Sequence, residues 1–163
     1  TDLVLVGDPE AGYGEERPTL ETHLADALSA LPADTDRSRI HHLGRLAYPD
    51  LVSLLQASHC HLGLSYPYTL SWSLLEAMAC GAPLVTNHGS PLAAELPSPG
   101  DETARLVPFG DEVALAQAIL ALLQSPEQRQ RLSQAGRRLI SERFNLEETR
   151  QSYDALFRSL LRS

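Results

Sequence analysis

The chain has 163 residues, 43% of them hydrophobic, which predicts one globular domain with its own core. Its net charge of −8 argues against nucleic acid as the main partner, and two cysteines are too few for a disulfide framework. No apolar run approaches the ~20 residues of a membrane span and the first residues do not resemble a signal peptide, so we expect a cytoplasmic location. All thirteen cationic residues are arginine, so a site that needs lysine is incomplete in this chain.

Strand and helix patterns alternate along the first third of the chain. An apolar segment at residues 1–7 predicts a buried strand, and because it has neither a cap nor an initiator methionine we expect a fragment of a longer protein. Glycine, proline and acidic residues at 9–18 predict a loop, and leucines at helical spacing predict a helix over 19–31. Residues 39–46 predict a short strand that runs into a glycine turn, and a helix is expected over 49–58.

The stretch 68–85 is the centre of the predicted organisation. Its middle predicts a helix that ends at Gly81 and Pro83, because glycine supplies a left-handed C-terminal residue and proline cannot continue a helix. Apolar runs at 61–65 and 83–87 predict a strand on either side. The whole segment therefore predicts a βαβ unit.

The rest of the chain continues the alternation. A short helix is expected over 92–96, and a strand over 104–108. Three helices follow, opened by Asp111, by Ser125 with a proline after it, and near Leu146. With about five strands alternating with helices, the sequence predicts an α/β, Rossmann-like parallel sheet with helices on both faces.

The start of the central helix is the candidate binding site. In a βαβ unit this helix start points to the carboxyl edge of the sheet, where unpaired N–H groups and the helix dipole favour an anion. We therefore predict a phosphate-bearing ligand at five residues, Thr69, Leu70, Ser71, Trp72 and Ser73.

Two residues of this helix allow structural alternatives. Glu76 lies one turn further in, where its carboxylate suits the hydroxyls of a sugar beside the phosphates. The same Glu76 also fits a capping box with Ser73, in which its carboxylate only bonds to backbone N–H groups. Trp72, a predicted donor-binding residue, is either a platform on which the base stacks or a packing anchor for the helix. The sequence leaves both alternatives open.

Residues 74–85, Leu-Leu-Glu-Ala-Met-Ala-Cys-Gly-Ala-Pro-Leu-Val, resemble the signature helix of glycosyltransferase family four (group 1), whose members are retaining enzymes of the two-domain GT-B fold. The resemblance implies that Glu76 is the second glutamate of the family's Glu-x7-Glu motif and binds the ribose hydroxyls of a nucleoside diphosphate sugar. The first glutamate, which contacts the donor sugar, falls at Tyr68, and Thr-Leu-Ser-Trp at 69–72 replaces the usual Gly-Phe-Gly-Leu. The Leu-Ser-Trp-Ser variant resembles a subgroup of bacterial and cyanobacterial enzymes.

Other segments extend the resemblance. The family's Val-x-Phe-Leu-Gly-x-Val segment implies that backbone groups of Arg45 and Leu46 contact the nucleobase. Glu95 coincides with a family glutamate near the donor, with a solvated helix acid as the structural alternative. Gly89 and Ser90 offer backbone N–H groups to phosphate or sugar.

The resemblance implies that residues 1–163 are the C-terminal, donor-binding part of a retaining glycosyltransferase, with the first strand and helix of that domain upstream. The acceptor site and any general base would lie in the enzyme's own N-terminal domain, so we expect this fragment to be inactive alone and assign it no catalytic residue. In the parent enzyme, the acceptor could be lipid-linked and the protein peripheral to a membrane. The alternative, favoured by Tyr68, is a degenerate, non-catalytic nucleotide-binding module.

No cofactor or metal is expected, although four histidines lie close in sequence. His41 and His42 point to opposite faces of their strand, and no third carboxylate or cysteine has ligand spacing beside His59 and His61. The resemblance likewise implies that the donor binds without a metal.

Overall fold

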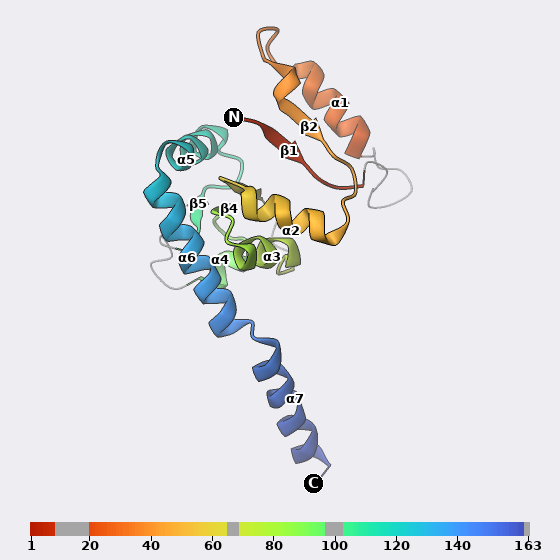
Figure 1. The fold of residues 1–163 in the computed structure, drawn as a ribbon, viewed down its shortest axis with the longest axis vertical. Helices are drawn as coiled ribbons and strands as arrows, with labels where there is room; N and C mark the ends of the chain where they lie inside the picture. The colour runs from red at the N-terminus through yellow and green to blue at the C-terminus, as the bar shows by residue number, and fades with distance from the viewer. Residues whose placement is uncertain (9–19, 65–68, 97–102, 162–163) are drawn as a thin grey trace. The chain divides into compact units, whose positions relative to one another are not determined.

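The computed structural model describes residues 1–8, 20–64, 69–96 and 103–161, and it forms two compact units, Thr1–Leu51 and Val52–Ser163 (Figure 1). The boundary between them falls inside α2 (Tyr48–Ala57).

The first unit is built on a pair of parallel strands. β1 (Leu3–Leu5) pairs with β2 (Ile40–His42), and Leu3 lies opposite Ile40. Helix α1 (Leu20–Ala30) and a 3-10 turn, η1 (Arg37–Arg39), connect the two strands. The connection is therefore a βαβ crossover.

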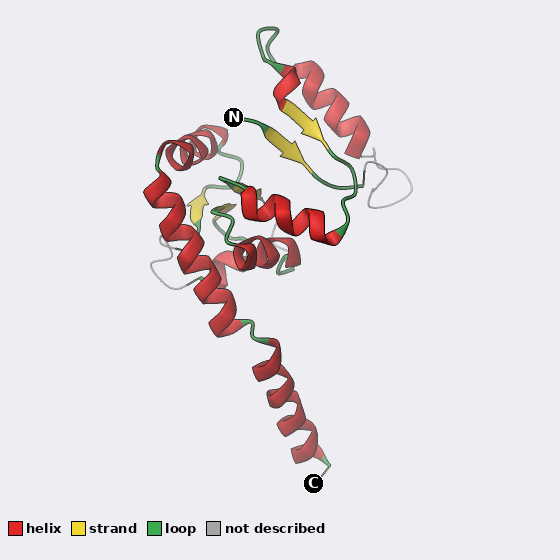
Figure 2. Cartoon of the chain, in the orientation of Figure 1, coloured by secondary structure: helices red, strands yellow, loops and turns green. Residues whose placement is uncertain are grey.

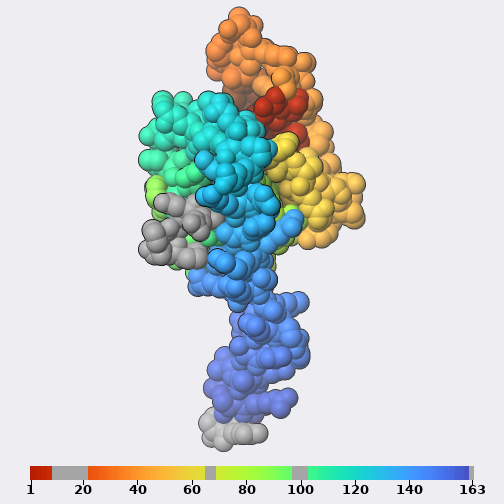
Figure 3. All heavy atoms as spheres, turned by 60° about the vertical axis from the view of Figure 1, so that its left-hand side comes forward, coloured from red at the N-terminus to blue at the C-terminus, as the bar shows by residue number. Residues whose placement is uncertain are grey.

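The described part of the second unit holds a three-stranded parallel sheet, the C-terminal part of α2 and five further helices (Figure 2). The strands stand in the order β3 (His61–Gly63), β4 (Leu84–Asn87) and β5 (Arg105–Val107). The further helices are α3 (Trp72–Cys80), α4 (Pro91–Glu95), α5 (Glu112–Gln124), α6 (Pro126–Arg143) and α7 (Leu146–Leu160). Helices α5 and α6 lie side by side on the surface of this unit (Figure 3).

The central strand β4 is buried along its whole length. Successive side chains of a strand point to opposite faces, and Leu84 and Val85 accordingly belong to different core clusters. Leu84 shares its cluster with Met78 of α3, and Val85 shares the other with Leu122 of α5. Helices therefore cover both faces of this sheet, as the sequence predicts.

The predicted strands and helices are confirmed, with bounds that differ by a few residues, but the burial expected of the first strand is wrong: Leu3 and Val4 of β1 are 45% and 36% exposed. The predicted caps are confirmed as well: Asp111 accepts from the Ala114 N–H at 2.9 Å, and Ser125 accepts from the Gln128 N–H at 3.2 Å. Gly81 has the expected left-handed backbone, with φ 84°. The predicted loop over 9–18 lies outside the described residues.

One expectation differs from the structure. The described strands form a two-stranded and a three-stranded sheet, and not one sheet of five strands. Hydrophobic patterns report how buried a strand is, and they do not identify the strand it pairs with.

Within the described ranges, no helix is both long and apolar enough to cross a membrane.

Candidate functional site

The start of α3 presents backbone donors that its own cap leaves free. Helix α3 begins at Trp72, and Ser71 is its N-cap in an extended conformation. The Ser71 side chain makes no capping bond, and its Oγ lies 2.8 Å from the Oγ of Ser73. The first helical bond runs from the Leu75 N–H to the Ser71 carbonyl. Among the described residues nothing accepts from the N–H groups of Trp72, Ser73 and Leu74, so this end of the helix suits an anion.

Packing fixes the position of α3. Leu74 and Met78 are 2% and 1% exposed, and a Cβ placed on Gly63 would lie 1.8 Å from Cδ2 of Leu74. The missing side chain at Gly63 therefore lets the first turn of α3 lie directly against β3. At the other end, the Gly81 N–H donates to the Met78 carbonyl at 2.9 Å.

Glu76 lies one turn after the helix start and is half-buried. The capping-box interpretation is wrong because the helix already begins at Trp72, with Ser71 as its cap, which places Ser73 inside the first turn. Within the described part of the chain, no hydrogen bond joins Glu76 to a backbone N–H group. Its carboxylate therefore remains available to a ligand.

Trp72 does not anchor the helix. Its side chain is 80% exposed, so the packing-anchor interpretation is wrong. The core contacts of the first turn come from the next apolar residue, Leu74, which points to the opposite side. The indole is therefore an exposed aromatic surface at the candidate site.

Of the two backbone N–H donors predicted after β4, the turn itself uses one, at Ser90. The Ser90 N–H donates to the Asn87 carbonyl at 3.2 Å, and the Ser90 Oγ accepts from the Ala93 N–H at 3.2 Å. Ser90 is 2% exposed and the turn after β4 uses its N–H internally, so a backbone contact between Ser90 and a ligand stays a prediction. Gly89 is exposed with φ 78°, and no described residue accepts from its N–H.

Glu95 is held by an arginine from α6. Nη2 of Arg143 lies 2.9 Å from Oε2 of Glu95, and Nη1 donates to the Glu95 carbonyl. The interpretation of Glu95 as a merely solvated acid is therefore wrong, because it joins α4 to the end of α6. A contact between Glu95 and the donor stays a prediction.

Two predicted residues belong to the first unit, and a third is outside the described residues. Arg45 belongs to the first unit, where its Nη1 lies 3.6 Å from Oδ2 of Asp8, and Leu46 is half-buried in the same unit. Their assignment to the nucleobase stays a prediction. Tyr68 lies outside the described residues.

Burial shifts the pKa of two groups on and before β3. It raises the pKa of the Cys60 thiol to about 11 and lowers the pKa of His61. Cys60 is therefore a neutral thiol at physiological pH, as expected for a structural residue.

No group of three or more His, Cys, Asp or Glu side chains in the described ranges could hold a metal ion.

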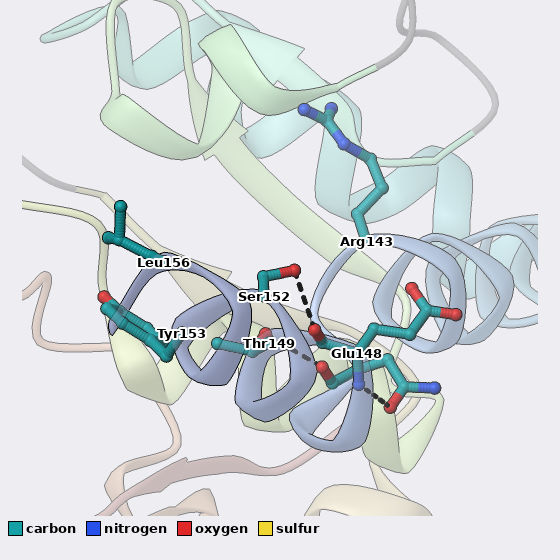
Figure 4. A pocket seen from close by; sticks show the side chains of 7 residues that line it. Arg143, Glu148, Thr149, Ser152, Tyr153 and Leu156 are labelled. Atoms are coloured by element: carbon teal, nitrogen blue, oxygen red, sulfur yellow. Dashed lines mark hydrogen bonds between the residues drawn. The ribbon is translucent and has the colours of Figure 1, made fainter. Parts of the chain in front are cut away.

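A hollow of about 340 Å³ lies along the junction of α6 and α7 (Figure 4). In Figure 4 the Arg143 side chain points away from the other labelled residues, consistent with its bonds to Glu95. None of the residues predicted to bind the donor lines it. The lining residues are Arg143, Asn145, Glu148, Thr149, Ser152, Tyr153 and Leu156.

The chain belongs to the glycosyl transferase-like family, whose model matches residues 3–153. It is 29% identical over 113 residues to the N-acetyl-alpha-D-glucosaminyl L-malate synthase of Bacillus anthracis, covering 69% of this chain and 29% of that protein.

Solved glycosyltransferase structures share its fold. Sucrose-phosphate synthase from Thermosynechococcus elongatus superimposes with a TM-score of 0.78 at 28% identity, over 98% of this chain and 38% of that one. HepE of Anabaena, solved with UDP, gives a TM-score of 0.78 at 23% identity, over 97% of this chain and 41% of that one. The α/β fold of this chain thus matches GT-B glycosyltransferases. The chain spans less than half the length of each of these relatives.

Proposed function

We propose that this chain is the donor-binding part of a retaining glycosyltransferase, which binds a nucleoside diphosphate sugar for transfer of the sugar to an acceptor. The start of α3 is the observation that supports it most. There the N–H groups of Trp72, Ser73 and Leu74 converge with no acceptor among the described residues. Membership of the glycosyl transferase-like family supports the same proposal.

These donors would act on the leaving group. When the glycosyl bond breaks, negative charge develops on the departing diphosphate. Preorganised N–H groups and the positive end of a helix dipole stabilise that charge without reorganising. The proposal therefore needs neither a metal nor a lysine in this part of the protein.

Glu76 would hold the ribose. Its half-buried carboxylate lies one turn from the proposed phosphate site, and an ionised carboxylate can accept hydrogen bonds from two neighbouring hydroxyls. The Gly89 N–H, exposed after β4, is a further candidate donor to the phosphates or the sugar.

Uridine diphosphate is the first nucleotide to test. HepE of Anabaena has been solved with UDP and with UDP-glucose. Because the nucleobase would be recognised by backbone groups, the side chains do not favour one base over another. The acceptor would bind outside this chain, which is consistent with the larger size of the relatives.

Amide NMR shifts test the proposal directly. We expect UDP, GDP or ADP to shift the amide signals of Trp72, Ser73 and Leu74, and the matching nucleoside without phosphates to leave them nearly unchanged. The reason is that only the phosphates reach the free donors of α3. Failure of all three nucleotides, or equal shifts with the nucleoside, would contradict the proposal.

A second candidate function is a nucleotide-binding module without transferase activity. Tyr68, which stands where the family's first glutamate contacts the donor sugar, favours it. Measurement of UDP-glucose hydrolysis by the full-length protein that contains this chain would separate the two. Nucleotide binding with no release of the free sugar above background, for any nucleotide sugar that binds, would favour the non-catalytic module.

A further inference from the structure

The single tryptophan of the chain occupies an unusual place. Trp72 is the first residue of α3 and is 80% exposed, whereas Leu74 and Leu75 of the same turn are 2% and 8% exposed. Large aromatic side chains are normally mostly buried, because they remove much apolar surface from water. Packing within this chain therefore does not explain why a tryptophan stands at this exposed position.

Trp72 and Glu76 share one face of α3. They stand four residues apart, the spacing at which helical side chains are neighbours. Helical side chains also tilt toward the N-terminus, so the indole of Trp72 lies beyond the carboxylate of Glu76, at the open end of the helix. The free N–H groups of the first turn lie at that same end.

The order of groups in the proposed ligand follows the same direction. A nucleotide sugar consists of base, ribose, diphosphate and sugar, in that order. If Glu76 holds the ribose and the N–H groups of the first turn hold the diphosphate, the next group outward is the sugar. The base lies on the other side of the ribose, away from Trp72.

We propose that the indole of Trp72 is the surface on which the donor's sugar ring stacks, and that it sets the preference for the sugar nucleotide over the bare nucleotide. This inference rests on the proposed function. A pyranose ring has an apolar face of C–H groups, which the electron-rich face of an indole attracts. The indole N–H can in addition donate to a sugar hydroxyl.

The residue at position 68 gives a reason for a different kind of sugar contact in this chain. A carboxylate at that position would bind the sugar hydroxyls, and this chain has none there. A stacking residue at the helix start supplies sugar contact by a different chemistry. It would favour pyranoses that present an unbroken C–H face.

Calorimetric titration of UDP and UDP-glucose tests the proposal, with the GDP and ADP pairs as alternatives if UDP does not bind. For the wild type we expect the sugar nucleotide to bind about three- to tenfold more tightly than the nucleotide, the size of an aromatic stacking contact. Trp72→Leu should bring the ratio of the two Kd values close to one, and Trp72→Phe should keep most of it. Tyr153→Leu, at an exposed aromatic residue of α7, is the matched control.

Fluorescence gives an independent readout because Trp72 is the only tryptophan. UDP-glucose should shift the indole emission to shorter wavelength more than UDP does, since stacking removes the ring from water. If methyl glucoside alone produces the shift while the Kd ratio stays near one, the indole contacts an acceptor sugar, and the proposal is wrong.

The outcomes separate this inference from the proposed function. If nucleotides bind but the Kd ratio is the same in wild type and Trp72→Leu, only the role of Trp72 is wrong. A fall of both affinities by one common factor would also overturn it, because it would mean that Trp72 merely supports the helix. If no nucleotide binds, the proposed function and this inference fail together.

Discussion

Nη2 of Arg137, on α6, donates a hydrogen bond of 2.7 Å to the carbonyl oxygen of Cys80, the last residue of α3. The negative end of the α3 dipole therefore has a cation beside it, which stabilises that end. At the positive end, the Ser71 side chain makes no capping bond. Arg137 thus balances the partial negative charge at the C-terminal end of α3. The N-terminal end, where we propose that a diphosphate binds, has no side-chain cap.

Gly81 should tolerate no side chain. Its φ of 84° strains any other residue, and a Cβ there would lie 2.3 Å from Nε of Arg137. We expect Gly81→Ala to lower the free energy of unfolding by about 2–3 kcal/mol in urea titrations. Gly110→Ala is the matched control, because Gly110 has φ 79° and open space around it, and it should cost only about 1 kcal/mol. An equal loss of unfolding free energy in the two variants would mean that the Arg137 side chain moves away from the new Cβ without an energetic cost.

Gly63 and Leu74 should be energetically coupled. Gly63→Ala would place a methyl group on the buried Leu74, at an expected cost of about 1–3 kcal/mol. Leu74→Ala alone should cost about 2–5 kcal/mol, and the double variant should lose clearly less than the sum of the two. Urea unfolding of all four proteins measures the coupling. Strict additivity would contradict direct contact between β3 and the first turn of α3.

His61 should make stability depend on pH. Burial lowers its pKa below the ordinary value of 6.5, so the unfolded chain takes up a proton there more readily than the folded chain does. The stability contributed by neutral His61 is therefore complete above pH 6.5 and is lost as the pH falls through 6.5 toward the lower folded value.

The slope of stability against pH tests this sign. We expect the free energy of unfolding to fall less between about pH 7 and pH 5 in His61→Asn than in the wild type. His59→Asn, at an exposed histidine two residues away, should keep the wild-type slope. An unchanged slope in His61→Asn would show that His61 is not the group responsible.

The two cysteines should differ in reactivity. With its pKa raised to about 11 by burial, the Cys60 thiol is almost wholly protonated near neutral pH. In reaction with a disulfide reagent at about pH 8, Cys80→Ser should therefore lose the fast phase and Cys60→Ser should keep it. The reverse pattern would contradict the burial of Cys60.

Local chemistry made much of the fold predictable. The repeat of Leu74, Leu75 and Met78 marks a buried helix face, and all three are in the core. The caps at Asp111, Ser125 and Gly81 could be predicted because the conformation of a helix end is set by a few neighbouring residues.

Contacts between residues far apart in the sequence could not be predicted in this way. Arg143 and Glu95 are 48 residues apart, and Arg137 and Cys80 are 57 apart, so no local spacing indicates either pair. The helix start was ambiguous because Thr69, Ser71 and Ser73 all carry hydroxyl groups suited to a cap. The boundary between the two compact units falls within α2, where no proline- or glycine-rich linker marks it.

The most direct test of the central claim is nucleotide affinity in Glu76→Ala beside Glu142→Ala, a matched change at an exposed glutamate of α6. We predict that Glu76→Ala weakens binding of the preferred nucleotide by about tenfold or more, as loss of hydrogen bonds to a charged group does, with the unfolding transition unchanged. Glu142→Ala should bind as the wild type does. Equal affinities in the two variants, or a loss of stability in Glu76→Ala without loss of binding, would contradict a donor site at the start of α3.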